Sequence, residues 1–285
     1  MWIFSKKKKT ITEENKSNLT DIPNVIYKYR DWNNKYHKSI LEENSLYMAN
    51  ASAFNDPFDC KISTNFHLLD CDEKRQQFIN DSITQNIDHI LANNIDVAQH
   101  RITLGNRLKD IDTFQKFSDD IEFSKNNDHI GILSMSARWN SILMWSHYGN
   151  FHQGFCVGFS EEKMRNSPLF GKCGLVNYVL DFPVYTPFED KEDKERQQMK
   201  VFYKSTEWKY EEEYRLVNMY VGIPFPKQDR TVKISDDFIV EINLGIGISD
   251  QHKKELLKIA AEKNIEVYQL SKVPFRYELE RKRIL

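Results

Sequence analysis

Three consecutive glutamates and an arginine stand in the segment Trp208–Val217, whose sequence is WKYEEEYRLV. Residues two apart on a β-strand share a face, so Glu211, Glu213 and Arg215 would line up together on a strand. Three acidic residues in a row beside a tryptophan are unfavourable in a strand unless a function requires them. The alternative is an exposed edge strand whose charges prevent pairing with another chain.

A second group of chemically versatile side chains lies between the apolar runs Ile130–Met135 and Gly154–Phe159. Buried Trp and Tyr bring one polar group that needs a partner, and histidine can titrate near neutral pH. These residues could bind a ligand, but structural aromatic residues outnumber catalytic ones, so a dense core is the simpler interpretation. The group comprises Trp139, Trp145, His147, Tyr148 and His152.

Arg30 closes the short β-rich run Val25–Arg30, VIYKYR. Its permanently charged guanidinium carries several donors and suits an anion or a carboxylate. A surface ion pair is an equally good interpretation of this residue.

The segment Phe54–Asp59, FNDPFD, has the composition of a turn, because Asn and Asp bond their own backbone and Pro fixes one torsion. The two phenylalanines would hold this loop on the core. Asp56 and Asp59 could bind a metal ion or a ribose hydroxyl, although two carboxylates in one turn are weak support for a metal.

The composition excludes several classes of protein. A net charge of −2 over 285 residues gives no basic excess that would indicate nucleic-acid binding. No window approaches the length of apolar sequence that a membrane helix needs. The N-terminal MWIFSKKKK has the reverse order of a secretory signal, and the four cysteines have no C-x-x-C spacing. We therefore expect a cytoplasmic protein with reduced thiols and no membrane partner.

The positions that must hold these side chains are predicted by apolar periodicity. Strands are expected at Val25–Arg30, Leu46–Ala49, Ile130–Met135, Gly154–Phe159, Cys173–Val179, Phe238–Leu244 and Ile265–Leu270. Helices are expected after an N-cap at Asp31, over Ile142–Trp145, Glu189–Ser205 and Ser249–Asn264, and in two stretches, Asp72–Asn93 and His100–Phe123. Strands and helices do not alternate regularly, which favours an α+β fold with a mixed, mainly antiparallel central sheet.

The domain organisation follows from the same patterns. Residues 1–22 are Lys-rich without periodicity, which indicates a flexible basic tail. Residues 23–285 are predicted to form one α+β domain. Within it, residues of about 65–127 contain no proline and one glycine, Gly105, and are predicted to form a helical insertion. This insertion could be a lid, a partner surface or a packing layer.

Five motifs together resemble the bacterial family called domain of unknown function 2971. They are VIYKYR, LYMANASAFNDPFD, ILSMS, MWSHYGNFHQGFCVGF and KSTEWKYEEEYRL, and they span most of residues 25–245. Some members of that family are associated with mobile elements and abortive phage-infection loci. The resemblance therefore implies a role in phage defence or in a toxin–antitoxin system, with a cognate antitoxin or defence partner.

A more distant resemblance is to ADP-ribosyltransferase folds, which open with a strand, a helix and a strand. Those folds use a basic residue on the first strand, an aromatic or hydroxyl residue on the second, and a Glu, often in an E-x-E pair, at a later strand. The matching residues here are Arg30, Tyr47 or Ser52, and Glu213 with Glu211.

This second resemblance implies a catalytic site that consumes NAD as a co-substrate, without a metal. Cleavage of nicotinamide from NAD passes through an oxocarbenium-like ribose, which Glu213 would stabilise while Glu211 orients or deprotonates a protein or nucleic-acid acceptor. Arg30 would hold pyrophosphate or ribose. Residues expected to contact the nucleotide are Tyr47, Ser52, Asn55, Asp56, Trp145, His147, Tyr148, His152 and Arg215.

Two other functions remain open. The same cleft could recognise a nucleotide, nucleic acid or protein without catalysis, as a sensor or antitoxin. A metal-dependent nuclease could use Asp56, Asp59, His147 and Glu213, although tight metal-ligand spacing is lacking. The geometric expectation common to the nucleotide hypotheses is that Arg30, Tyr148 and Glu213 converge on one cleft.

Overall fold

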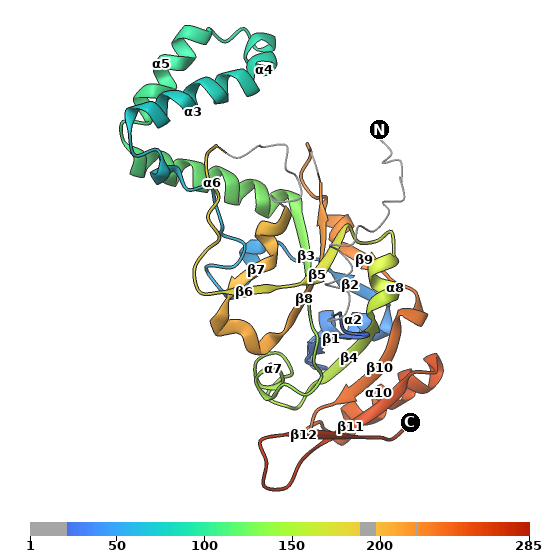
Figure 1. Ribbon diagram of the computed structural model, residues 1–285. Helices are drawn as coiled ribbons and strands as arrows, with labels where there is room; N and C mark the ends of the chain where they lie inside the picture. Colours follow the sequence, from blue (N-terminus) through green and yellow to red (C-terminus); the bar gives the residue numbers. More distant parts are fainter. Residues whose placement is uncertain (1–21, 189–197, 221) are drawn as a thin grey trace.

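An eight-stranded sheet forms the centre of the computed structural model, which describes residues 22–188, 198–220 and 222–285 (Figure 1). The strand order is β12-β11-β10-β4-β1-β3-β8-β5, and every neighbouring pair is antiparallel except β10 with β11. The strands are β1 Val25–Arg30, β3 Ile130–Ser136, β4 Phe155–Ser160, β5 Lys172–Leu175, β8 Glu213–Met219, β10 Ile239–Leu244, β11 Glu266–Lys272 and β12 Leu279–Arg283. This arrangement confirms the predicted α+β class with a mixed, mainly antiparallel central sheet.

Two small sheets accompany the large one. Strand β2, Ser45–Tyr47, pairs with β9, Thr231–Lys233, so the second predicted strand is not part of the central sheet. The strand predicted over Cys173–Val179 is divided into β5 and β6, Asn177–Val179. Strand β6 pairs in parallel with β7, Tyr203–Ser205.

The position of β8 overturns the interpretation of an edge strand. It lies between β3 and β5, and its burial pattern shows Glu213 and Arg215 buried together with their apolar neighbours. The expected common strand face is correct for Glu213 and Arg215 but wrong for Glu211. That residue ends a 3₁₀ helix, η5, Thr206–Glu211, just before the strand.

Helices pack on the sheet, and capping residues mark where each helix begins and ends. Helix α10, Asp250–Lys263, begins after Ser249 and ends at Asn264, and its Leu256 and Ala260 are buried in the main core. Helix α2, Lys35–Glu42, has Asn34 as its N-cap, so the prediction of Asp31 was wrong: Asp31 instead accepts from the backbone of Asn33. The other short helices are α7 Ile142–His147 and α8 Glu161–Asn166.

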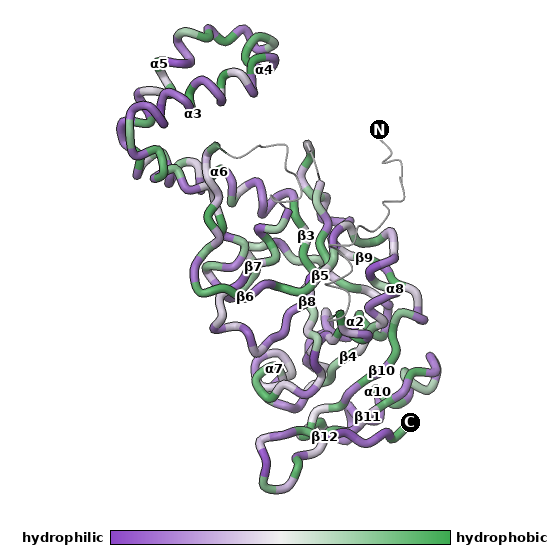
Figure 2. Tube along the Cα trace, in the orientation of Figure 1, coloured by the Kyte–Doolittle hydropathy of each residue, from purple (hydrophilic) through white to green (hydrophobic). Residues whose placement is uncertain are grey.

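The predicted helical insertion is present and projects from the sheet (Figure 1). It comprises α3 Asp72–Gln85, α4 Ile87–Ala92, α5 Val97–Arg107 and α6 Ile111–His129, which share a core of their own. The second helical stretch, expected over His100–Phe123, is largely helical but is divided between α5 and α6, because Asp110 is the N-cap of α6 and accepts from the backbone amide of Thr113. In Figure 2 the helices α3 and α5 alternate between hydrophilic and hydrophobic residues, as amphipathic helices do.

Several of the turns are short 3₁₀ helices. They are η2 Ala51–Ala53, η3 Phe66–Leu68, η4 Lys200–Phe202, η6 Lys227–Arg230 and η7 Asp236–Phe238. The helix predicted over Glu189–Ser205 is wrong at its C-terminal end, where η4 and β7 lie. Residues 189–197 and the predicted tail up to residue 21 lie outside the described residues.

The C-terminal segment adds a strand, β12, that was not predicted from the sequence. Strand β12 follows β11 and pairs with it. Tyr268 lies opposite Arg283 at one end of the pair, and Lys272 lies opposite Leu279 at the other. On β12, Arg281 bonds the carboxylate of Glu241 and the amide oxygen of Asn243.

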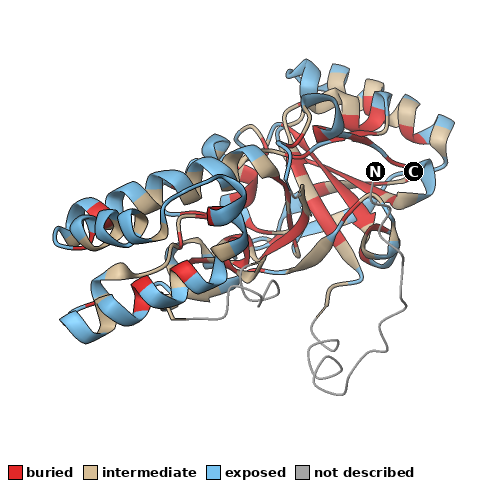
Figure 3. Ribbon diagram, turned by 90° about the horizontal axis from the view of Figure 1, so that it is seen from above, coloured by how far each residue is buried: buried red, intermediate tan, exposed pale blue. Residues whose placement is uncertain are grey.

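The central sheet and the helical insertion differ in how far their residues are buried. In Figure 3 the buried residues concentrate in the sheet, whereas the insertion helices are largely exposed. The main core packs α2 and α10 on the sheet, and a second cluster around Tyr29 and Trp145 covers another part of it. Within the described ranges, no helix is both long and apolar enough to cross a membrane.

Candidate functional site

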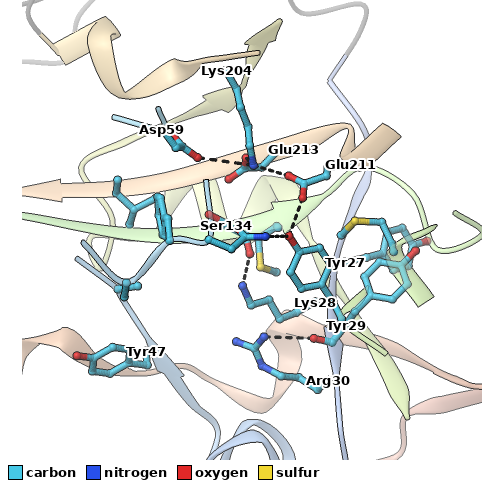
Figure 4. A pocket seen from close by; sticks show the side chains of 18 residues that line it. Tyr27, Lys28, Tyr29, Arg30, Tyr47, Asp59, Ser134, Lys204, Glu211 and Glu213 are labelled. Carbon is cyan, nitrogen blue, oxygen red and sulfur yellow. Dashed lines mark hydrogen bonds and ion pairs between the residues drawn. The ribbon is translucent and has the colours of Figure 1, made fainter. Parts of the chain in front are cut away.

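A pocket of about 350 Å³ opens where β1, β3 and the start of β8 meet. Figure 4 shows Lys28 and Arg30 on one side of it and the cluster of Lys204, Glu211 and Glu213 on the other. The pocket therefore brings cations and carboxylates from two segments of the chain that are far apart in sequence into one site.

The cationic side of the pocket comes from strand alternation. Lys28 and Arg30 are two residues apart on β1 and share a face, while Tyr29 between them is buried. Lys28 Nζ donates to the carbonyl of Ser134, and Arg30 Nη1 donates to the carbonyl of Tyr29 at 3.2 Å. In the described part of the chain, neither cation forms an ion pair with a carboxylate.

Burial without a counter-ion lowers the pKa of both groups. Burial, and then repulsion from Arg30, holds the pKa of Lys28 well below its usual range. Burial lowers the pKa of the Arg30 guanidinium to about 10. An anion bound in the pocket would supply the missing counter-charge, so this side of the pocket favours phosphate or carboxylate groups.

The acidic side depends on a left-handed residue between two glutamates. Glu212 has φ of +40°, so the chain turns sharply between η5 and β8 and directs both neighbouring carboxylates toward Lys204. Lys204 Nζ lies 2.5 Å from Glu211 Oε2 and 3.1 Å from Glu213 Oε2. Tyr148, which follows α7, donates its hydroxyl to Glu211 Oε1 at 2.8 Å.

Arg215 lies beneath this pair and is fully buried. Its guanidinium bonds both oxygens of Glu213 at 2.7 and 2.9 Å and both oxygens of Asp59 at 2.6 and 2.9 Å. Burial would raise the pKa of Glu213, but Arg215 and Lys204 outweigh it and hold that pKa well below its usual range. Glu213 is therefore ionised at neutral pH, with both oxygens accepting hydrogen bonds.

Six predicted site residues line this pocket: Arg30, Tyr47, Asn55, Tyr148, Glu211 and Glu213. The expected convergence of Arg30, Tyr148 and Glu213 on one cleft is confirmed. Asn55 donates to the Tyr148 hydroxyl at 3.3 Å, and the half-exposed Tyr47 stands at the edge of the site in Figure 4. These aromatic and amide groups could contact a planar ring or a sugar.

Trp145, His147 and His152 do not line the pocket. Trp145 is fully buried and donates to the carbonyl of Trp139 at 2.7 Å, which is a core role. His152 stacks on Trp145, and its Nε2 lies 3.1 Å from Ser146 Oγ. The exposed His147 contacts the ring of Tyr210.

Three other predicted residues are also absent from the pocket lining. The backbone amide of the exposed Ser52 donates to Asn127 on α6. Arg215 supports Glu213 from below, as described above. Asp56 lines a different pocket, which it shares with Phe58 and Phe182.

Lys28 and Lys204 are the main residues that sequence reasoning missed. Lys28 carried a usable signal, because the run VIYKYR places two basic residues two apart on one strand face. Lys204 carried none, since its partners are set by the tertiary fold. Asp59 was considered as a ligand to a metal or ribose and instead accepts from Arg215.

Metal ligation requires converging donors of a suitable kind. Among the described residues, no three or more His, Cys, Asp or Glu side chains are arranged to hold a metal ion.

Comparison with known proteins gives one match. The model of a family described as "Protein of unknown function (DUF2971)" matches residues 144–216. No curated protein and no solved structure matched the chain. The matched segment runs from α7 into β8 and contains Tyr148, Lys204, Glu211 and Glu213 of the pocket. Over these residues the chain is similar to the DUF2971 family, in agreement with the resemblance drawn from its motifs.

Proposed function

We propose that this pocket binds NAD and that the protein cleaves the bond between nicotinamide and ribose, transferring ADP-ribose to an acceptor or to water. The observation that carries the proposal is the arrangement of charge. Lys28 and Arg30, which form no ion pair with a carboxylate of the described residues, face the held carboxylates Glu211 and Glu213 across one pocket of about 350 Å³. That volume is in the range of small-molecule sites.

The cations fit the anionic part of the ligand. Lys28 and Arg30 bind pyrophosphate oxygens, because charge-assisted hydrogen bonds are stronger than neutral ones and both cations otherwise remain without a counter-ion. Tyr47 and Tyr148 border the space that the nicotinamide ring occupies, with offset or edge contacts.

The carboxylates fit the reacting carbon. The C1′–N bond breaks with its electron pair leaving on nicotinamide, and the ionised Glu213 stabilises the oxocarbenium-like ribose. The acceptor then forms a bond to C1′, and its proton passes to Glu211, whose Oε1 is oriented by Tyr148 at 2.8 Å.

A non-catalytic nucleotide-binding module is the second candidate, and a specific contact favours it. Both oxygens of Glu213 already accept from Arg215, and Lys204 also bonds one of them. A carboxylate held in this way contributes to the structure and is less available to a ribose. In this alternative the cationic side still binds phosphates, and no bond is cleaved.

One set of variants separates the two candidates. We expect Glu211→Gln and Glu213→Gln to reduce nicotinamide release from NAD at least about 100-fold while retaining ADP-ribose binding measured by calorimetry. Glu212→Gln is the matched control, because the Glu212 side chain is 44% exposed and pairs with Arg138 at 2.9 Å outside the pocket. Wild-type turnover in folded Glu211→Gln and Glu213→Gln would refute the transferase. Tight ADP-ribose binding without nicotinamide release by the wild type would favour the binding module.

The cellular setting belongs to the same proposal. We infer that the protein acts in the bacterial cytoplasm as an effector of phage defence or of a toxin–antitoxin system. Expression of the wild type should then lower cellular NAD and arrest growth, while Glu211→Gln should do neither. Equal growth arrest by both proteins would refute an effector role based on NAD.

A further inference from the structure

A second pocket of about 310 Å³ adjoins the first, and the two share Asp59 and Lys204. The loop Phe54–Asp59 separates them, because Asn55 lines the first pocket and Asp56 lines the second. The proposed cleavage of NAD does not use this second pocket.

Asp56 is the unusual group in the second pocket. Its side chain belongs to a residue that is only 5% exposed, and Oδ1 accepts from the backbone amide of Phe58 at 2.9 Å. Oδ2 is buried and has no hydrogen-bond partner within the described residues. A buried carboxylate oxygen without a partner is unfavourable, and Asp56 lines this pocket, so a donor that reached Oδ2 from the pocket would remove that cost.

The charge of the walls specifies the sign of the donor. Asp56, Asp59 and Asp181 line the pocket, and Lys204 is the basic residue among its lining side chains. Lys204 Nζ lies 3.6 Å from Asp59, which Arg215 also bonds, so Asp59 is already paired, whereas Asp56 and the exposed Asp181 form no ion pair within the described residues. The surroundings of Asp56 therefore favour a cation over a neutral donor.

The apolar part of the pocket specifies what carries the cation. Phe58 and Phe182 are 64% and 50% exposed, and their ring centroids lie 6.5 Å apart in an edge-to-face arrangement. Leu180 beside them is 86% exposed. Aromatic faces attract cations and bury apolar groups, whereas a bare metal ion would gain nothing from them.

We propose that the second pocket binds an organic cation, an ammonium or guanidinium group attached to an apolar or aromatic body. The cation donates to Asp56 Oδ2, and Phe58 and Phe182 cover the attached body. This inference does not depend on the reaction in the first pocket, because none of these three residues lines it.

The test measures binding of three probes to the full-length protein by calorimetry or NMR titration. The probes are benzylamine, the neutral benzyl alcohol and the anionic benzoate. Benzylamine should bind at least about tenfold more tightly than benzyl alcohol, since a charge-assisted hydrogen bond distinguishes them. Benzoate should bind more weakly than either.

Two variants connect this binding to the pocket. Asp56→Asn keeps an oxygen that can accept from the Phe58 amide but removes the charge, and it should reduce benzylamine affinity to that of benzyl alcohol. Phe182→Ala should weaken both probes, and its exposed position makes loss of folding unexpected. Glu207→Gln removes an exposed charge outside the lining residues and should leave binding unchanged.

Three results would overturn the proposal: equal affinity for amine and alcohol, wild-type amine affinity in Asp56→Asn, or no benzylamine binding at about 10 mM. A capped Gly-Lys-Gly peptide, compared with its norleucine analogue, distinguishes the two sources of the cation. Peptide binding that requires the lysine identifies a protein side chain as a ligand. Binding of benzylamine alone identifies a small amine, and either result supports the cation site.

Discussion

Replacing Lys204 with methionine removes the cation that three buried carboxylates share. Its Nζ lies 2.5 Å from Glu211, 3.1 Å from Glu213 and 3.6 Å from Asp59. With Arg215, the wild-type cluster has three negative and two positive charges, whereas Lys204→Met would leave three negative charges and one positive. Methionine is similar in length to lysine, so the change tests charge more than packing.

The expected loss in free energy of unfolding at pH 7 is about 3–5 kcal/mol, the range found when one partner of a buried ion pair is removed. The two negative charges left without a balancing cation place this variant at the upper end. Since native proteins are stable by only about 5–15 kcal/mol, the loss would be easily measured.

The loss should depend on pH with a definite sign. In the wild type the pKa of Glu213 lies below its ordinary 4.5, so its stabilisation is present above that pH and disappears as the pH falls through the folded-state pKa. Without Lys204 the carboxylates protonate at higher pH in the folded state, which relieves their repulsion. The difference between wild type and variant should therefore be largest at neutral pH and shrink in acid.

Urea unfolding followed by circular dichroism at several pH values between about 4.5 and 8 measures both quantities. Lys233→Met is the matched control, because Lys233 and Glu43 form an ion pair at 3.1 Å in which both side chains are about 60% exposed. That variant should lose no more than about 1 kcal/mol. The reasoning is refuted if Lys204→Met loses less than about 1 kcal/mol at pH 7 or if its loss grows in acid.

Three further predictions concern Lys28, Gly154 and the effect of a chelator. Lys28→Met should stabilise the protein by about 0.5–2 kcal/mol in urea unfolding, because it removes a buried cation of lowered pKa. The same variant should weaken ADP-ribose binding measured by calorimetry. A destabilised variant contradicts this prediction. Gly154→Ala should cost about 1–3 kcal/mol in thermal unfolding, because its Cβ would meet the Arg30 carbonyl and displace β1 from β4; an unchanged melting temperature contradicts this. A chelator should leave NAD turnover and ADP-ribose binding unchanged, whereas loss of activity on chelation would favour the metal-dependent nuclease.

Local patterns predicted much of the fold. Strands β3 and β4 were placed to within one residue at each end, since each is an apolar run bounded by polar or turn residues. Helix α10 was also predicted well, because Ser249 and Asn264 are recognisable caps. The charged sequence before Ser205 has helical periodicity, and there the prediction failed, because β7 is held by its pairing with β6.

Strand alternation determined only part of the site. Arg30 was found because it ends a strand, and Glu213 because it begins one next to other charged residues. The pairing of Lys204 with Asp59 and Glu211 joins a small sheet, a loop and a 3₁₀ turn, and no local periodicity connects these three elements. Only the tertiary arrangement reveals that these charges form one buried cluster.

The contrast between the two lysines separates the parts of the site by role. Lys204 has three carboxylates around it, and these raise its pKa despite the opposing effect of burial. Lys28 forms no ion pair among the described residues, and burial and the neighbouring Arg30 lower its pKa despite attraction from Glu213 and Glu211. A buried charge that is already neutralised holds the structure, whereas a buried charge without a counter-ion reduces stability unless a ligand supplies one. The side of the pocket formed by Lys28 and Arg30 is therefore the side on which a ligand has the most to contribute.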